Sequence, residues 1–254
     1  AEGSNYISCN KIVVPSEAIH KEDFFMKNFF AFPTKNSWNE DIFQLKPAGI
    51  LTVVVLICLL IAIALFLQPK QIRSKKFTTH QLVFSSVAMA LAIVTSMIKL
   101  FEMPLGGSVT PFSMLFIVLI GYWYGPKAGL MTGFAYGLLQ FVLSPIFYSI
   151  PQLIVDYPLA FGALGISGFF SNKKYGLQIG YIAGVLGRLV FAWLSGILFF
   201  ASYAEGPGMS VPIYSLAYNG SYLGVEGAIT LVILCIPPVA EALKQVRLQA
   251  TQAG

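Results

Sequence analysis

Hydrophobic residues are concentrated in long stretches of this chain, and glycine, proline and charged residues gather in the short segments between them. Since a helix needs about 20 apolar residues to cross the hydrocarbon core of a bilayer, these stretches predict transmembrane helices. The clearest, 48–67, is uninterrupted and uncharged. Six more are expected at 81–100, 111–124, 126–143, 152–170, 177–203 and 211–239. The pattern predicts an all-α membrane protein with seven spans, of which 111–124 is short.

Composition supports a lipid environment. Hydrophobic residues make up 56% of the chain and charged residues only 11%, with a mean hydropathy of +0.73. Ordinary soluble domains carry about 25% charged residues, so this chain has too little charge to cover a soluble surface. The excess of 16 Lys and Arg over 11 Asp and Glu lies in short clusters beside apolar runs, which is typical of membrane loops and does not indicate nucleic-acid binding.

Basic residues also predict the orientation, because cytoplasmic loops carry more of them. The clusters are Lys70, Arg73, Lys75 and Lys76; Lys127; Lys173 and Lys174; and Lys244 and Arg247. With seven spans they all fall on one side, so we expect a cytoplasmic C-terminus and an external N-terminal segment. Loops 103–110, 144–151 and 204–212 then lie outside.

The chain divides into four expected parts. An external N-terminal segment (1–46) precedes an additional transmembrane helix with its basic linker (47–79), a six-helix membrane domain (80–242) and a cytoplasmic tail (243–254). Phenylalanines cluster between positions 24 and 32, which leaves two interpretations of 1–46. It is either an interfacial or partner-binding segment, or a small external loop.

Small residues recur at four-residue spacing, which allows helices to approach closely in a membrane. Glycines do so at 129, 133 and 137 and again at 180 and 184, which indicates bundle packing. Ala88 and Ala92 form a similar pair on 81–100. This pair suits either bundle packing or a partner subunit.

Asp156 is the acidic residue that most needs an explanation, because it stands among apolar neighbours where a charge is costly. One interpretation is structural, since unpaired N–H groups in the first turn of a helix attract a carboxylate. The other is that Asp156 meets a cationic ligand from outside. Glu226 and Arg188 are further charges at membrane depth; they suit an ion pair, and the sequence assigns them no function.

Tyr214 and Asn219 lie near the external end of the last span and could face one cavity between helices. An amide offers donors and an acceptor, which suits the edge of a heterocycle, but interhelical hydrogen bonding explains Asn219 equally well. Aromatic residues gather on the same side, either as an interfacial belt or as a cage for a flat cation. They are Phe147, Tyr148, Tyr157, Trp193, Phe199, Phe200, Tyr203, Tyr214, Tyr218 and Tyr222.

Sequence motifs for chemistry are missing. The chain has no Gly-x-x-x-x-Gly-Lys-Ser/Thr loop, no His-Glu-x-x-His and no Gly-x-Ser-x-Gly. Its two histidines and three cysteines show no metal-like spacing. The sequence therefore predicts neither an enzyme, nor a metal site, nor a cofactor.

Four blocks of sequence resemble the thiamine-specific S components of energy-coupling factor (ECF) transporters, the ThiT or YuaJ type. They are MPLGGSVT (103–110), YGPKAG (124–129), DYPLAFGA (156–163) and YSLAYNGSY (214–222). The resemblance covers residues from about 80 to 242. It implies a six-helix S-component bundle that captures thiamine without acting on it chemically, preceded here by one additional helix.

The resemblance also assigns residues. Asp156, followed by Tyr157, would offset the thiazolium cation, and Tyr214 and Asn219 would hydrogen-bond the aminopyrimidine. Three further residues would contact the rings of the ligand: Phe200, Trp193 (or Ala192 in its place) and Tyr148.

Partners follow from the resemblance as well. A transmembrane coupling subunit would dock on the first helix of the bundle at Ala88 and Ala92, and two cytoplasmic ATPase subunits would drive uptake across a bacterial plasma membrane. Residues 1–79 lie outside the resemblance. An S component for another vitamin or heterocycle, an intramembrane enzyme and a structural or sensory protein stay as alternatives.

Overall fold

The computed structural model describes residues 31–35, 41–48, 51, 55, 78–204 and 207–252. The expected span 48–67 lies almost wholly outside the described residues, as do 1–30 of the N-terminal segment and the linker up to residue 77. Within 31–45, β1 (Ala31–Lys35) pairs antiparallel with β2 (Asp41–Leu45).

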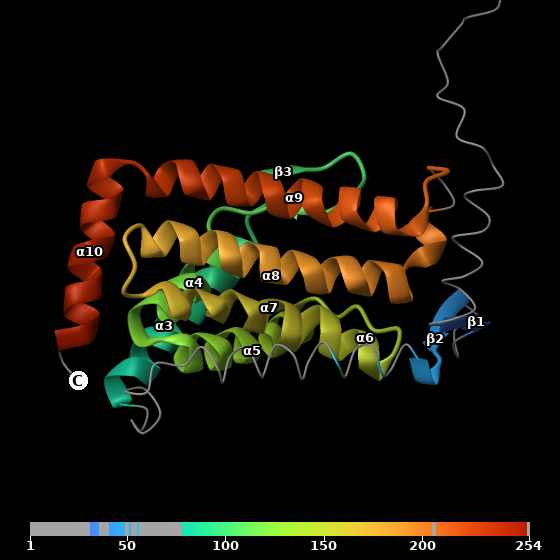
Figure 1. The fold of residues 1–254 in the computed structure, drawn as a ribbon, viewed down its shortest axis with the longest axis horizontal. Coiled ribbons are helices and arrows are strands. Elements are labelled where there is room, and N and C mark those ends of the chain that lie inside the picture. The colour runs from blue at the N-terminus through green and yellow to red at the C-terminus, as the bar shows by residue number, and fades with distance from the viewer. Residues whose placement is uncertain are drawn as a thin grey trace, which may run out of the picture.

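Residues 78–204 and 207–252 form a bundle of long helices that lie side by side, with one helix across its end (Figure 1). The bundle begins with α3 (Thr79–Ser96), α4 (Ser113–Tyr124) and α5 (Pro126–Leu143). A broken segment follows, made of α6 (Ile150–Ile154), the π-helical turn η2 (Val155–Leu159), α7 (Ala160–Gly162) and the 3₁₀ helix η3 (Ala163–Phe170). The remaining elements are α8 (Gly176–Phe199), the short 3₁₀ helix η4 (Ala201–Ala204), α9 (Val211–Leu234) and α10 (Pro237–Gln252).

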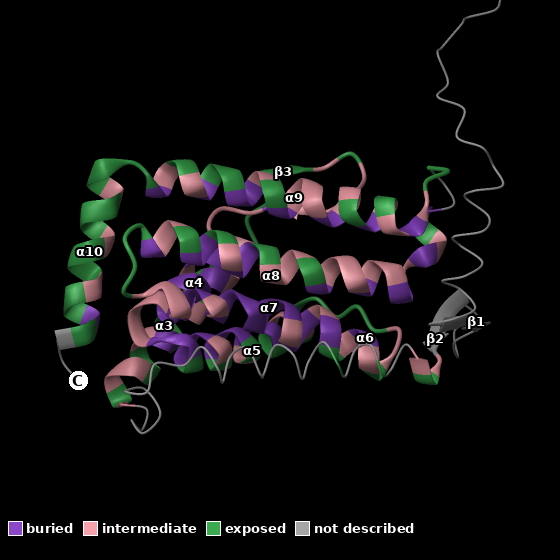
Figure 2. Cartoon of the chain, viewed as in Figure 1, coloured by how far each residue is buried: buried purple, intermediate pink, exposed green. Residues whose placement is uncertain are grey.

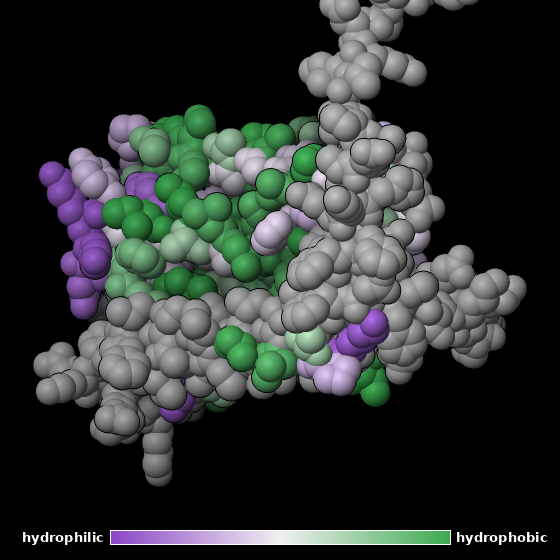
Figure 3. Space-filling view, turned by 45° about the vertical axis from the view of Figure 1, so that its right-hand side comes forward, coloured by the Kyte–Doolittle hydropathy of each residue, from purple (hydrophilic) through white to green (hydrophobic). Residues whose placement is uncertain are grey.

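The predicted all-helical membrane fold is confirmed, and each of the six expected spans after residue 80 coincides with a helix or a run of helices. Three stretches in the described part are long and apolar enough to cross a membrane by themselves: Thr79–Ser96, Ile150–Phe170 and Gly176–Phe199. A fourth is added if α9 and α10 count as one bent span. Hydrophobic side chains cover the flank of the bundle, and hydrophilic ones gather at the end that α10 crosses (Figure 3).

The short helix α4 is the centre of the core. Its side chains Met114, Ile117, Val118 and Ile120 are fully buried, which Figure 2 shows as a purple element among its neighbours. Twelve residues are too few to span the hydrocarbon core, but a helix shielded by protein does not need to match the bilayer. The turn to α5 follows the sequence, because Gly125 has a φ of 93° and Pro126 begins the next helix.

The glycine stripe of α5 packs against the broken segment, as expected. A Cβ at Gly137 would collide with the carbonyl oxygen of Tyr157, and one at Gly133 would collide with that of Phe161. The segment departs from a regular helix at Pro158, which has no N–H to donate and lies inside the π turn. The close approach of α5 therefore fixes the turn that carries Asp156.

The last span was predicted to run from 211 to 239, but its helix ends earlier. α9 ends at Leu234, and α10 continues at an angle of 86°. The cause is the pair Pro237 and Pro238, since proline cannot continue a helix but is well placed in the first turn of the next one. Residues 243–252 are thus helical. Arg247 connects this helix to the bundle by donating to the Tyr122 hydroxyl at 2.8 Å and to the Ser171 carbonyl at 3.0 Å.

Ala88 and Ala92, the pair predicted to dock a partner subunit, lie on the inner face of α3. Ala88 is 7% exposed and packs with Ile120 and Ala128, and Ala92 is fully buried in the main core. The Ala92 carbonyl also accepts a hydrogen bond from the Tyr136 hydroxyl at 3.2 Å. The small side chains serve bundle packing, because they let α4 and α5 come close.

Candidate functional site

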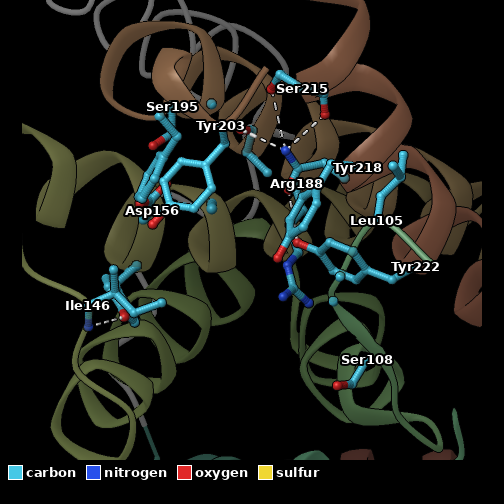
Figure 4. A pocket seen from close by; sticks show the side chains of 18 of the residues that line it. Leu105, Ser108, Ile146, Asp156, Arg188, Ser195, Tyr203, Ser215, Tyr218 and Tyr222 are labelled. Carbon is cyan, nitrogen blue, oxygen red and sulfur yellow. Dashed lines mark hydrogen bonds between the residues drawn. The ribbon is translucent and has the colours of Figure 1, made fainter. Parts of the chain in front are cut away.

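A cavity of about 800 Å³ opens among the helices at the end of the bundle opposite α10. This volume lies in the range of small-molecule sites. Its walls come from the connection between α3 and α4, from α5 and the chain after it, from η2 and α7, and from α8, η4 and α9 (Figure 4). The lining residues are Leu105, Gly106, Gly107, Ser108, Gln140, Ser144, Ile146, Tyr148, Asp156, Tyr157, Ala160, Phe161, Arg188, Ala192, Ser195, Gly196, Phe200, Tyr203, Tyr214, Ser215, Tyr218, Asn219 and Tyr222.

Asp156 presents its carboxylate to this cavity from the π turn. Gln152, which is fully buried, donates to Asp156 Oδ2 at 2.6 Å from one turn earlier. Ser195 of α8 lies beside the carboxylate in Figure 4. η2 continues α6 directly, so Asp156 lies past the first turn of the segment that begins at Ile150, and the helix-end explanation of its position does not apply.

Tyr157 lines the cavity, and its hydroxyl is engaged with the chain after α5. It donates to the Ser144 carbonyl at 2.9 Å and accepts from the Ile146 N–H at 2.9 Å. Gln152 supports the same segment by donating to the Ile146 carbonyl at 3.2 Å and accepting from the Tyr148 N–H at 3.0 Å. The chain that carries Tyr148 is thus held in place by two residues of the broken segment.

Three aromatic rings cluster where α8 ends. Tyr148 and Phe200 pack edge to face with centroids 5.1 Å apart, and Tyr203 lies 6.1 Å from Phe200. The two tyrosine hydroxyls lie 3.1 Å apart. Such a cluster offers ring faces and edges on which a flat cation can stack.

α9 contributes a row of tyrosines at four-residue spacing. Tyr214 and Tyr218 have centroids 6.2 Å apart, and Tyr218 and Tyr222 have centroids 5.8 Å apart. All three line the cavity together with Asn219, so the structure brings Tyr214 and Asn219 to one site, as the sequence predicted.

The Asn219 side chain serves bundle packing as well. Its Nδ2 donates to the Ala192 carbonyl of α8 at 3.2 Å and to the Ser215 carbonyl at 3.0 Å. Its Oδ1 accepts from the Tyr222 hydroxyl at 3.0 Å. Because an amide oxygen has two lone pairs, Oδ1 keeps one acceptor position for a ligand.

Trp193 is the predicted site residue that the structure places outside the cavity. Its indole N–H donates to the Pro212 carbonyl at 2.9 Å, which links α8 to the start of α9. Ala192, its neighbour in the chain, lines the cavity instead. The other six predicted residues, Tyr148, Asp156, Tyr157, Phe200, Tyr214 and Asn219, are brought together.

Several lining residues were not predicted. Arg188 lies across the cavity from Asp156 and stacks on Phe161 at 4.2 Å from the ring centroid (Figure 4). Leu105 to Ser108 bring the connection between α3 and α4 into the wall. Gln152 does not line the cavity but binds Asp156, and it was not predicted either. The available signal was its spacing of four residues to Asp156, because such residues share one face of a helix.

The arrangement suits binding of a small, flat, positively charged molecule. A carboxylate favours the charge, aromatic rings offer stacking, and Tyr214 and Asn219 offer hydrogen bonds to a heterocycle. Among the described residues, no group of three or more His, Cys, Asp or Glu side chains is placed to hold a metal ion.

Comparisons with known proteins point to one family. The sequence profile of the thiamine transporter protein family (Thia_YuaJ) matches residues 82–245, which include every lining residue. The thiamine transporter ThiT of Bacillus subtilis (strain 168) is 38% identical over 168 residues, which are 61% of this chain and 85% of that protein. A solved structure of ThiT from Listeria monocytogenes superposes with a TM-score of 0.53 and 25% identity, over 62% of this chain and 94% of that one. The predicted resemblance is confirmed: the chain belongs to the thiamine transporter protein (Thia_YuaJ) family.

Proposed function

We propose that this chain captures thiamine in the cavity beside Asp156, as the substrate-binding (S) subunit of an ECF-type importer. The observation that carries this proposal is Asp156 itself, an acidic side chain that faces an aromatic cavity of about 800 Å³ inside the segment shared with the thiamine transporters. A permanent cation such as thiazolium gives a carboxylate at this depth a clear role, because a buried charge needs a partner.

The proposed placement of thiamine uses the two sides of the cavity. The thiazolium ring lies toward Asp156 and stacks near Phe200 and Tyr148, while the aminopyrimidine lies toward Tyr214 and Asn219. Asn219 Oδ1 and the tyrosine hydroxyls can exchange hydrogen bonds with the amino group and ring nitrogens. Tyr157 contributes its ring to the wall and holds the segment that carries Tyr148.

Uptake by this proposal needs a transmembrane coupling subunit and two ATPase subunits. The buried pair Ala88 and Ala92 leaves the outer face of α3 for the coupling subunit. That face is exposed and carries Ser86 and Ala90, a second small pair four residues apart. We place the protein in a bacterial plasma membrane with the cavity open to the outside, the N-terminal segment external and α10 cytoplasmic. The basic residues Lys127, Lys173 and Arg247 near the α10 end support this orientation.

Thiamine titration of the detergent-purified protein, followed by tryptophan and tyrosine fluorescence, tests the proposal. We expect saturable binding that excess riboflavin or a pyrimidine base does not displace. Absence of thiamine binding by protein with a cooperative thermal transition would contradict the proposal. Saturable binding of a heterocycle of another class in place of thiamine would reassign the substrate.

A further inference from the structure

Glu226 is a buried acidic residue that the proposed thiamine site does not use. It lies on α9, one turn beyond Tyr222, and is only 3% exposed. Its Oε2 accepts from the Thr110 hydroxyl at 2.8 Å and the Thr110 N–H at 3.4 Å. Its Oε1 accepts from the Ser113 hydroxyl at 2.9 Å and the Met114 N–H at 3.4 Å. Both oxygens thus bind the junction between residues 110 and 114, more than 110 positions earlier in the chain.

This junction ends the connection from α3 to α4, which forms a wall of the cavity. The connection contains the short antiparallel pair β3 (Phe101–Glu102) and β4 (Ser108–Val109), and residues 105–108 line the cavity between and at these strands. Gly106 and Gly107 lie directly against rings of α9: a Cβ on Gly106 would come 2.9 Å from Tyr218, and one on Gly107 would come 2.5 Å from Tyr222. Residues 105–108, called the wall below, therefore contact two tyrosine rings of α9, and the junction that follows them is hydrogen-bonded to Glu226 of the same helix.

The N–H groups at the start of α4 need a hydrogen-bond acceptor from another part of the chain. The residue before α4, Phe112, has a φ of 61° and makes no side-chain cap, and residues with a side chain rarely adopt this conformation. The first N–H groups of a helix have no partner within it, and Met114 N–H is one of them. Glu226 supplies this acceptor across the bundle, and its negative charge suits the positive end of the α4 dipole.

We propose that Glu226 is a positioning residue: by holding residues 110–114 it fixes the wall 105–108 over the cavity and so slows the release of the bound ligand. This inference rests on the proposed thiamine function for its kinetic part only. The position of the wall is a property of the protein without ligand and is tested independently.

The main variant is Glu226→Gln, which keeps the shape of the side chain and replaces one acceptor oxygen by a donor group. Thr110→Val is the second variant, since it removes the shortest hydrogen bond without altering a buried charge. Glu102→Gln is the matched control, because it makes the same change at an exposed glutamate of the same connection, whose Lys99 contact contributes little. Stopped-flow fluorescence gives the association and dissociation rate constants for thiamine, and amide hydrogen exchange is measured without ligand.

For Glu226→Gln we expect dissociation to be about tenfold faster, with association changed by less than about threefold. Exchange should accelerate in residues 101–114 more than in α5 or α8. Thr110→Val should act in the same direction with a smaller effect, the double variant should be less than additive, and Glu102→Gln should match the wild type.

Unchanged exchange in 101–114 for both Glu226→Gln and Thr110→Val would overturn the proposal. So would faster exchange with an unchanged dissociation rate, because the wall would then not control release. A fall in melting temperature alone, with both rate constants unchanged, would show that Glu226 only stabilises the fold. A wild type that binds no thiamine would remove the proposed function and leave the exchange result to decide the position of the wall.

Discussion

Gln152 Nε2 donates a hydrogen bond of 2.6 Å to Asp156 Oδ2, from a position one turn earlier in the same segment. The same amide binds the Ile146 carbonyl and the Tyr148 N–H, so one buried side chain joins the acidic group to the neighbouring wall. Asp156 is thereby held in one orientation before a ligand arrives. Such preorganisation lowers the cost of binding, because fewer groups must be ordered in the complex.

Replacement of Gln152 by methionine tests this role. Gln152→Met keeps the size of the side chain but leaves Asp156, the Ile146 carbonyl and the Tyr148 N–H without this partner. We expect thiamine affinity to fall about tenfold and the free energy of unfolding to fall by about 1–3 kcal/mol, since unpaired buried polar groups are costly. Isothermal titration and thermal unfolding measure both effects. Wild-type affinity in a well-folded variant would show that Asp156 needs no such support.

The neighbours Ala192 and Trp193 should respond in opposite ways. Ala192→Leu adds bulk to the cavity wall and should weaken thiamine binding at least about tenfold, because small-to-large changes cost about 1–3 kcal/mol where space is filled. Trp193→Phe removes the hydrogen bond to Pro212 outside the cavity and should leave affinity within about threefold, with a stability loss near 1 kcal/mol. Binding that falls sharply for Trp193→Phe and not for Ala192→Leu would reverse this assignment.

The two small residues Ala90 and Ala92 of α3 should also differ. Ala92 is fully buried beneath α4 and α5, so Ala92→Leu overpacks the core and should destabilise the protein by about 1–3 kcal/mol. Ala90 is exposed, and Ala90→Leu should leave the melting temperature and thiamine affinity near the wild-type values. If the outer face of α3 meets the coupling subunit, Ala90→Leu should still reduce thiamine uptake in cells. Equal melting temperatures for the two variants would contradict the burial of Ala92.

The sequence was sufficient for the helical frame, because hydropathy and glycine spacing are local signals. Residues 126–143, for example, coincide with α5 at both ends. The end of the last span was misplaced, since continued hydropathy after Leu234 outweighed the signal of Pro237 and Pro238. The seven-span count and the division at residue 79 stay predictions, because the first expected span lies almost wholly outside the described residues.

Asp156 and Asn219 line the cavity, in agreement with the family motifs that carry them, and their roles in binding stay predictions. The resemblance left open whether Trp193 or Ala192 contacts the ligand, because a step of one residue along a helix turns the side chain by about 100°, and the structure places Ala192 on the cavity wall. The contacts of Glu226 with Thr110 and Ser113 join residues more than 110 positions apart, and no local sequence pattern in either segment predicts them. The inner position of Ala88 and Ala92 likewise depends on which face of α3 the bundle covers.

The measurement that tests the account most directly compares thiamine with a neutral analogue in which an uncharged ring replaces the thiazolium. Both are titrated into the wild type and into Asp156→Asn, with Glu241→Gln on the exposed face of α10 as the control. We predict that the wild type prefers the cation, that Asp156→Asn weakens thiamine binding about tenfold to a hundredfold, and that it changes binding of the neutral analogue by less than about threefold. An equal loss for both ligands, or no loss for thiamine, would contradict the pairing of Asp156 with the thiazolium charge.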